Sequence, residues 1–241
     1  MLKKKLYIHQ NIPYAFNWNK IHHKEKLTQL RVNRDELKKL KEHFERIYQG
    51  MIPNNLFNSR NLPRVSQFKI KGLKTAYIRS FSKKLIRSGK IINHDSNSKL
   101  PKYVQRVINN YKENRISGIP GHEPILKNIL IKDKDSIAIE IPIWNEKTHK
   151  VITGHIDLLQ IENDIVKVVD YKPEGNFLLS LPQVATYGYL LKSSFNINKM
   201  RCISFNRDEA WEYDPEILVS DIKDYLISHR INERPWEKYI H

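Results

Sequence analysis

The sequence is poor in the features that would mark a secreted or membrane protein. It has one cysteine, Cys202, among 241 residues, which excludes an internal disulfide and is typical of a reducing cytoplasm. It contains no run of 18 apolar residues, so no transmembrane helix is expected. The basic amino end, MLKKKLYIHQ, lacks the apolar stretch of a signal peptide. These absences predict a cytoplasmic protein without a membrane partner.

Acidic residues are scarce in the first hundred positions. Residues 1–100 contain 23 Lys and Arg but 6 Asp and Glu, whereas residues 101–241 contain 19 and 20. The two balances, +17 and −1, sum to the net charge of +16. Because Lys and Arg contacts to phosphate supply most non-specific DNA affinity, this asymmetry predicts a polyanion-binding region joined to a near-neutral one. We expect residues 1–100 to be a basic, mainly helical DNA-binding region and residues 101–241 a separate core.

The order of the predicted elements, a helix, three strands, a helix and a strand, suggests an α/β fold with a mixed central sheet and helices on both sides. Asn33 is a candidate cap for the first long helix, and Gly50 follows its end. The turn-rich stretch 89–101 is the candidate domain boundary, and residues 51–65 read as a loop. The predicted helices are 33–48, 73–88, 102–115 and 216–230, the last starting near Asp214 or Pro215, and the predicted strands are 136–144, 151–161, 165–172 and 200–206.

The segment 151–172, VITGHIDLLQIENDIVKVVDYK, contains the candidate catalytic residues. Two apolar runs flank a polar turn, which predicts a β-hairpin whose two turn residues, Asn163 and Asp164, tolerate positive φ angles. In that register Ile161 faces Val166, Leu159 faces Val168, and Asp157 faces Asp170. Side chains alternate along a strand, so these six and Lys172 share one face.

Two carboxylates at the end of an apolar strip repel one another, and desolvation raises at least one pKa. Bound Mg²⁺ or Mn²⁺ removes this conflict, polarises a phosphoryl oxygen and acidifies water, while Lys172 can steady the attacking water. The alternative is a surface hairpin with a solvated acidic pair. Because the other face (Ile156, Leu158, Ile165, Val169) is also apolar, the hairpin is expected to be central and the metal site is favoured.

A helix with a pair of polar residues on one face follows the hairpin. Ser180 is its candidate N-cap, and Pro182 fits a first turn because its missing N–H costs nothing there. Gln183 and Tyr187 are four apart and share a helix face. On spacing alone, Tyr187 reads as a core aromatic and Gln183 as a chance neighbour.

Together, Gly154-x-x-Asp157, Asp170-x-Lys172 and Gln183-x-x-x-Tyr187 resemble the PD-(D/E)XK nuclease superfamily, in particular its RecB-like branch, which includes CRISPR-associated exonucleases. The resemblance covers residues 115 to 230. It implies a restriction-endonuclease-like core, with Gln183 and Tyr187 positioning the DNA strand. Many relatives hold an iron–sulfur cluster with four cysteines, which this chain cannot do.

The resemblance also implies an upstream metal ligand, usually a His four residues after a Gly. Gly118 and His122 have that spacing, although the nearby prolines place His122 on a loop or at a helix start. Glu140 and Glu123 are the alternatives, in that order after His122. A His ligand would suit Mn²⁺ better than Mg²⁺.

The prediction is a Mg²⁺- or Mn²⁺-dependent deoxyribonuclease. His122, Asp157, Asp170 and the backbone carbonyl of Tyr171 would hold the ion, and Lys172 would assist catalysis. The resemblance favours an end-processing exonuclease. Two alternatives stay open: a structure- or sequence-specific endonuclease, which would form a homo-oligomer, and a non-catalytic nucleic-acid-binding module on the same fold.

Overall fold

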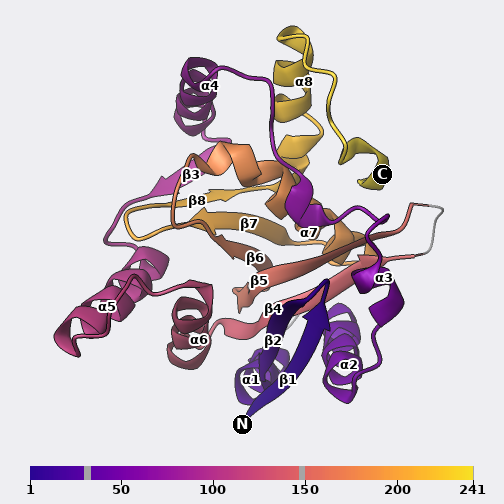
Figure 1. Cartoon of the computed structure of the whole chain (residues 1–241), viewed down its shortest axis with the longest axis vertical. Helices are drawn as coiled ribbons and strands as arrows, with labels where there is room; N and C mark the ends of the chain where they lie inside the picture. Colours follow the sequence, from indigo (N-terminus) through magenta and orange to yellow (C-terminus); the bar gives the residue numbers. More distant parts are fainter. Residues whose placement is uncertain (30–33, 147–149, 241) are drawn as a thin grey trace.

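The computed structural model describes residues 1–29, 34–146 and 150–240. Across these residues the chain forms a single eight-stranded mixed sheet in the order β1-β2-β4-β5-β6-β7-β8-β3 (Figure 1). Strands β6 and β7 pair in parallel, and the other neighbours pair antiparallel. The strands are β1 Leu2–His9, β2 Ile12–Asn19, β3 Ile91–His94, β4 Ser136–Asn145, β5 Ile152–Glu162, β6 Ile165–Tyr171, β7 Met200–Phe205 and β8 Ala210–Tyr213.

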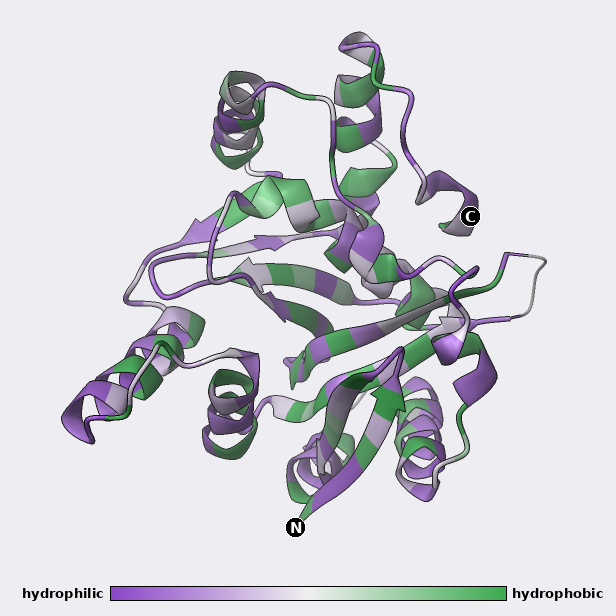
Figure 2. Cartoon of the chain, viewed as in Figure 1, coloured by the Kyte–Doolittle hydropathy of each residue, from purple (hydrophilic) through white to green (hydrophobic). Residues whose placement is uncertain are grey.

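Helices cover both faces of this sheet, which confirms the predicted α/β class. One core lies beneath α5 and α6, and a larger one lies beneath α2, α4, α7 and α8. Hydrophobic residues follow the central strands in Figure 2. The α-helices are α1 Lys20–Gln29, α2 Arg34–Gln49, α3 Asn54–Asn58, α4 Thr75–Arg87, α5 Lys99–Glu113, α6 His122–Lys132, α7 Phe177–Phe195 and α8 Asp221–Ser228. Within the described ranges, none of these helices is long and apolar enough to span a membrane.

Most predicted elements are present with small shifts in their ends. Helices 33–48, 73–88 and 102–115 correspond to α2, α4 and α5, while Asn33, the candidate cap of the first, lies outside the described residues. The predicted helix 216–230 is divided into a 3₁₀ turn, Pro215–Leu218, and α8. Asp214 caps the 3₁₀ turn, because its side chain accepts a hydrogen bond from the Glu216 amide.

The sequence does not predict the three strands of the first hundred residues. Strands β1 and β2 form one edge of the sheet, and β3, inside the stretch 89–101 assigned to a boundary, forms the other. Strand β1 carries Lys3, Lys4 and Lys5, and such charges are tolerated because an edge strand exposes much of its surface. The strands of this segment are therefore divided between two opposite edges of one sheet (Figure 1).

The hairpin formed by β5 and β6 has the predicted register from the turn to the Leu158–Val169 pair, and the predicted pair Asp157–Asp170 lies just beyond it. Leu159 pairs with Val168 and Ile161 with Val166. The turn residues Asn163 and Asp164 have φ angles of 48° and 63°, as a tight hairpin turn requires. Because Asn and Asp tolerate this left-handed region, the turn fixes the register and with it the level at which Asp157 and Asp170 lie.

Helix α7 begins earlier than predicted. Its N-cap is Asn176, whose side chain accepts a hydrogen bond from the Leu178 amide, so the assignment of Ser180 as the cap is wrong. Pro182 consequently lies inside the helix rather than in its first turn. The earlier start buries Phe177, Leu178 and Leu181, and this burial outweighs the lost Pro182 hydrogen bond.

Candidate active site

Strands β4 and β5 both reverse their faces near the middle of the sheet. Residues two apart on a strand normally share a face, yet Ile141 packs beneath α7 while Ile139 packs beneath α5 and α6. Their partners on β5 show the same reversal: Ile156 packs beneath α7, and Leu158 packs beneath α5 and α6. Glu140 lies at this reversal with a φ of 51°, which is uncommon for a residue other than glycine. The reversal places Glu140 and Asp157 between the two cores rather than within either.

Asp157 is held from the side of the sheet that α6 covers. Its Oδ2 accepts a hydrogen bond of 3.0 Å from the Tyr171 amide and lies 3.5 Å from Nδ1 of His122. His122 is the first residue of α6, which agrees with the predicted helix start, and its ring packs edge-on against Tyr171. The hydrogen bond to Asp157 raises the pKa of His122 despite its partial burial. The predicted neighbours His122, Asp157 and Tyr171 are thus in direct contact.

Asp170 is held by a lysine on the side that α7 covers. Its carboxylate is 1% exposed, and Oδ2 lies 2.7 Å from Nζ of Lys172. The same Nζ donates to Oε1 of Gln183 at 3.3 Å. In the described part of the chain, neither Asp170 oxygen has another hydrogen-bond donor. Asp170 is therefore a buried carboxylate with unused ligand capacity.

Asp157, Asp170 and Glu140 form what we call the acidic cluster, and two of its carboxyl groups are difficult to ionise. Burial, followed by repulsion from Asp157, raises the pKa of Asp170 to about 7. Burial, followed by repulsion from Asp157, also raises the pKa of Glu140 to about 8. Burial lowers the pKa of Lys172, but the Asp170 and Asp157 carboxylates outweigh it and raise the pKa overall. Perturbed groups that face one another in this way are concentrated at functional sites.

Helix α7 approaches the cluster through Tyr187, which is 1% exposed. The Tyr187 hydroxyl is hydrogen-bonded to the Gln183 side chain and to the backbone of His155. Tyr187 passes so close to β5 that a Cβ on Gly154 would lie 2.5 Å from its Cε1 atom. Gly154 is thus required by this close approach, and it sets how near Gln183 and Tyr187 lie to Asp170.

Replacing Gly154 with alanine is expected to destabilise the protein by about 1–3 kcal/mol, because the new methyl group overpacks the contact with Tyr187. Chemical denaturation of the purified variant measures this change. The matched test adds Tyr187→Ala, which removes the clashing ring. The cost of Gly154→Ala should then fall to the smaller cost of the remaining 3.2 Å approach to Val65 Cβ, whereas an unchanged cost in the double variant would contradict the assigned clash.

A second polar cluster braces β5 two residues before Asp157. His155 stacks on Tyr14 with ring centroids 3.7 Å apart, and its Nε2 lies 2.8 Å from Nδ1 of His9. Arg64 lies 3.2 Å from Nδ1 of His155 and also donates to the Tyr14 hydroxyl. Burial lowers the pKa of His155, so its ring is neutral at pH 7. Sequence reasoning misses this cluster, because no local spacing relates His9, Arg64 and His155.

The predicted residues are therefore largely brought together, but Asp157 and Asp170 are held from opposite sides of the sheet and not on the one predicted shared face. His122, Asp157, Tyr171 and Glu140 lie on or beside the face reversal, and Asp170, Lys172, Gln183 and Tyr187 adjoin them. Glu123, the third candidate for the upstream ligand, lies exposed in the first turn of α6. Within the described residues it forms no ion pair, although its charge contributes to the raised pKa of Glu140.

The oxygen and nitrogen donors suit a hard divalent cation, but they are not arranged in a coordination shell. No group of three or more His, Cys, Asp and Glu side chains in the described ranges is already placed to hold a metal ion. Asp157 contacts His122 and Asp170 contacts Lys172, so both carboxylates already have a side-chain partner. The free oxygen capacity of Asp170 and the raised pKa values of Asp170 and Glu140 are the features that a cation would satisfy.

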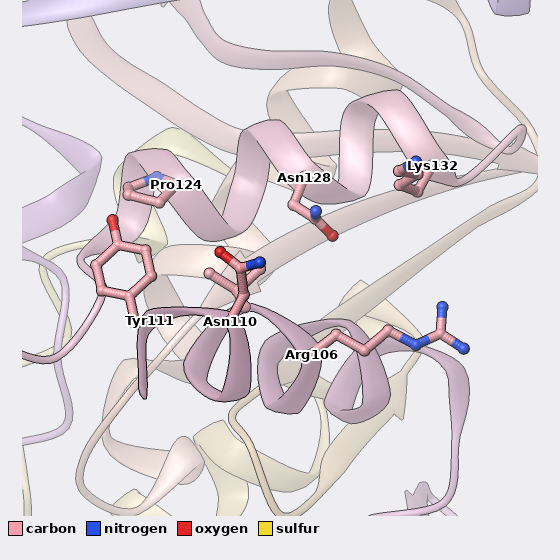
Figure 3. Close-up of a pocket in the computed structure, with 7 residues that line it drawn as sticks. Arg106, Asn110, Tyr111, Pro124, Asn128 and Lys132 are labelled. Atoms are coloured by element: carbon pink, nitrogen blue, oxygen red, sulfur yellow. The ribbon is translucent and has the colours of Figure 1, made fainter. Parts of the chain in front are cut away.

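A separate pocket of about 520 Å³ lies between α5 and α6. Figure 3 shows Arg106, Asn110 and Tyr111 from α5 facing Pro124, Asn128 and Lys132 from α6. No Asp or Glu lines this pocket, so it lacks the ligands that a hard cation needs. The carboxylates that the sequence offers as candidate ligands lie in the Asp157–Asp170 cluster instead.

Comparison with known proteins does not assign this chain to a family. No family model matches the sequence, and no curated protein is significantly similar to it. A solved structure described as the crystal structure of SSO0001 matches 70% of this chain and 94% of its own, with 19% sequence identity and a TM-score of 0.27. A likeness this weak supports no conclusion about fold or function.

Proposed function

We propose that this protein is a metal-dependent nuclease that hydrolyses phosphodiester bonds in DNA, on a restriction-endonuclease-like core formed by β4, β5, β6, α7 and β7. The observation that carries the proposal is the buried Asp170 carboxylate, which is repelled by Asp157 and lies 2.7 Å from Lys172. A structural ion pair needs one acid and one base. The additional acids Asp157 and Glu140 make the cluster costly unless a cation binds there.

Each residue has a role that follows from its contacts. Asp157, Asp170 and His122 would hold Mg²⁺ or Mn²⁺, with Glu140 as a further ligand and Tyr171 orienting Asp157 through its amide. A divalent cation supplies Lewis acidity toward a phosphoryl oxygen. Lys172, freed from Asp170, would donate to the attacking water or the developing negative charge. Gln183 fixes the Lys172 ammonium, and both Gln183 and Tyr187 would position the strand.

Among nucleases we favour an end-processing exonuclease, since the Gln183–Tyr187 pair resembles the motif of the exonuclease-rich RecB-like branch. The structure supports this by placing the pair directly against the acidic cluster.

An assay with end-labelled linear DNA and covalently closed circular DNA tests the proposal. With Mg²⁺ or Mn²⁺ the linear substrate should be degraded and the circle left intact, and EDTA should stop the reaction. Cleavage of the circle would instead indicate an endonuclease. No cleavage of either DNA with either metal would contradict a nuclease and support a binding module.

A further inference from the structure

A groove of about 800 Å³ runs alongside α4. Gly175 and Asn176, three and four residues after Lys172, form part of its wall. Asn206 forms another part, and it directly follows Phe205, whose carbonyl accepts the Lys172 amide at 2.8 Å. The groove is thus bordered by segments that follow Lys172 and its backbone partner Phe205, while the side chains of the acidic cluster do not line it.

One wall of the groove is strongly basic. Between Lys74 and Lys90 the chain has six Lys and Arg and no Asp or Glu. Arg79 and Lys83 line the groove, are exposed, and lie one helical turn apart on the same face of α4. Neither forms an ion pair with any residue that the structure describes. Glu209 is the one carboxylate among the lining residues, and its Oε1 already accepts a hydrogen bond from Asn93.

The floor of the groove is apolar. It is formed by Leu73, Ile78, Ile86, Phe177, Leu179 and Trp211, of which Leu179 is 37% exposed whereas Ile78, Phe177 and Trp211 are buried. Phe177 and Trp211 stack with ring centroids 4.7 Å apart, and the Ser82 hydroxyl ties α4 to Asn176 at the start of α7. The two cations therefore stand above an apolar surface that is fixed in place by α7 and β8.

We infer that this groove binds a single strand of nucleic acid and leads it to the acidic cluster, an inference that rests on the proposed nuclease function. A duplex presents phosphates but keeps its base faces stacked inside, so it could use the cations and not the apolar floor. A single strand offers both a charged backbone and unstacked bases, and it matches both parts of the groove. The groove thus favours single-stranded over double-stranded nucleic acid, whereas the acidic cluster does not distinguish the two.

Charge reversal of the groove tests the inference. Arg79→Glu combined with Lys83→Glu should weaken binding of a fluorescent single-stranded oligonucleotide about tenfold, measured in EDTA so that no strand is cut. The slope of log affinity against log salt should fall by about 1.4, the value for two lost phosphate contacts on a single strand. Binding of the matching duplex should change far less.

The control is Lys20→Glu combined with Lys24→Glu, an equally spaced and exposed basic pair on α1, near the opposite edge of the sheet. This pair should leave single-strand affinity nearly unchanged. An oligonucleotide with abasic sites should bind the unaltered protein about fivefold more weakly, because it has no bases for the floor. Equal losses in both variants, equal losses for duplex and single strand, or full affinity for the abasic strand would each overturn the inference.

Cleavage assays on the same proteins separate this inference from the nuclease proposal. If the unaltered protein cuts DNA but the groove variant keeps its single-strand affinity, the groove inference fails and the nuclease proposal stands. If single-strand binding depends on Arg79 and Lys83 but no metal supports cleavage, the groove inference stands and the nuclease proposal fails.

Discussion

Asp170→Asn should abolish metal-dependent DNA cleavage, with a loss of at least about 10³-fold, because the amide cannot supply the negative charge that a cation and Lys172 both require. The side chain keeps its shape, so the sheet around it should be undisturbed. Lys172→Met should lose activity to a similar degree, since the ammonium 2.7 Å from Asp170 is the nearest proton donor to the cluster. Initial rates on end-labelled DNA with Mn²⁺ measure both effects.

The chain offers a matched control for these substitutions. Asp133 is also a buried aspartate, 2% exposed, with a lysine ammonium, Lys99 Nζ, at 2.7 Å. Asp133→Asn therefore removes the same charge from a similar ion pair outside the acidic cluster. It should leave cleavage within a few-fold of the unaltered protein. DNA affinity should survive in both variants, and a rate for Asp170→Asn close to that of Asp133→Asn would refute the assignment.

The hairpin at the centre of this site is predictable because its signals are local. Alternating apolar runs define β5 and β6, and the pair Asn163–Asp164 suits the positive φ angles of the turn. The edge strand β1 is not predictable in the same way, since LKKKLYIH has a charged start and gains its partner only from β2. The start of α7 is mispredicted because Pro182 looks like a first-turn residue until the burial of Phe177 is known.

The acidic cluster is predictable only in part, because some of its geometry follows from local signals and the rest from long-range packing. Asp170 and Lys172 follow from alternation along one strand, a local rule, whereas Asp157 lies at the face reversal, where alternation does not hold. The side from which each acid is held depends on the face reversal at Glu140. No sequence pattern predicts that a glutamate will adopt a positive φ angle. The reversal separates the partners: α6 supplies His122 to Asp157, and the segment before α7 supplies Lys172 to Asp170. Long-range packing thus decides which basic side chain contacts which acid.

The raised pKa values make the stability of this protein depend on pH. Because burial and Asp157 raise the pKa of Asp170 from 3.8 to about 7, the folded state binds more protons than the unfolded state between those values. Its contribution is fully present at low pH and is lost as pH rises through about 7. Glu140, with a pKa of about 8, acts in the same direction. His122, whose pKa is raised by its hydrogen bond to Asp157, also loses its contribution as pH rises.

Metal-free protein should therefore lose stability, on the order of 3 kcal/mol, between pH 5 and pH 8, as measured by urea denaturation in EDTA. Mn²⁺ should restore most of this loss at pH 8 and little at pH 5, because protons compete with the cation for the same carboxylates. Asp170→Asn removes one competing group, so the variant should show a flatter pH profile and a smaller Mn²⁺ effect, whereas Asp133→Asn should retain both. Stability that rises with pH in EDTA, or a Mn²⁺ effect that is the same in Asp170→Asn, would show that these acids do not form the cation site.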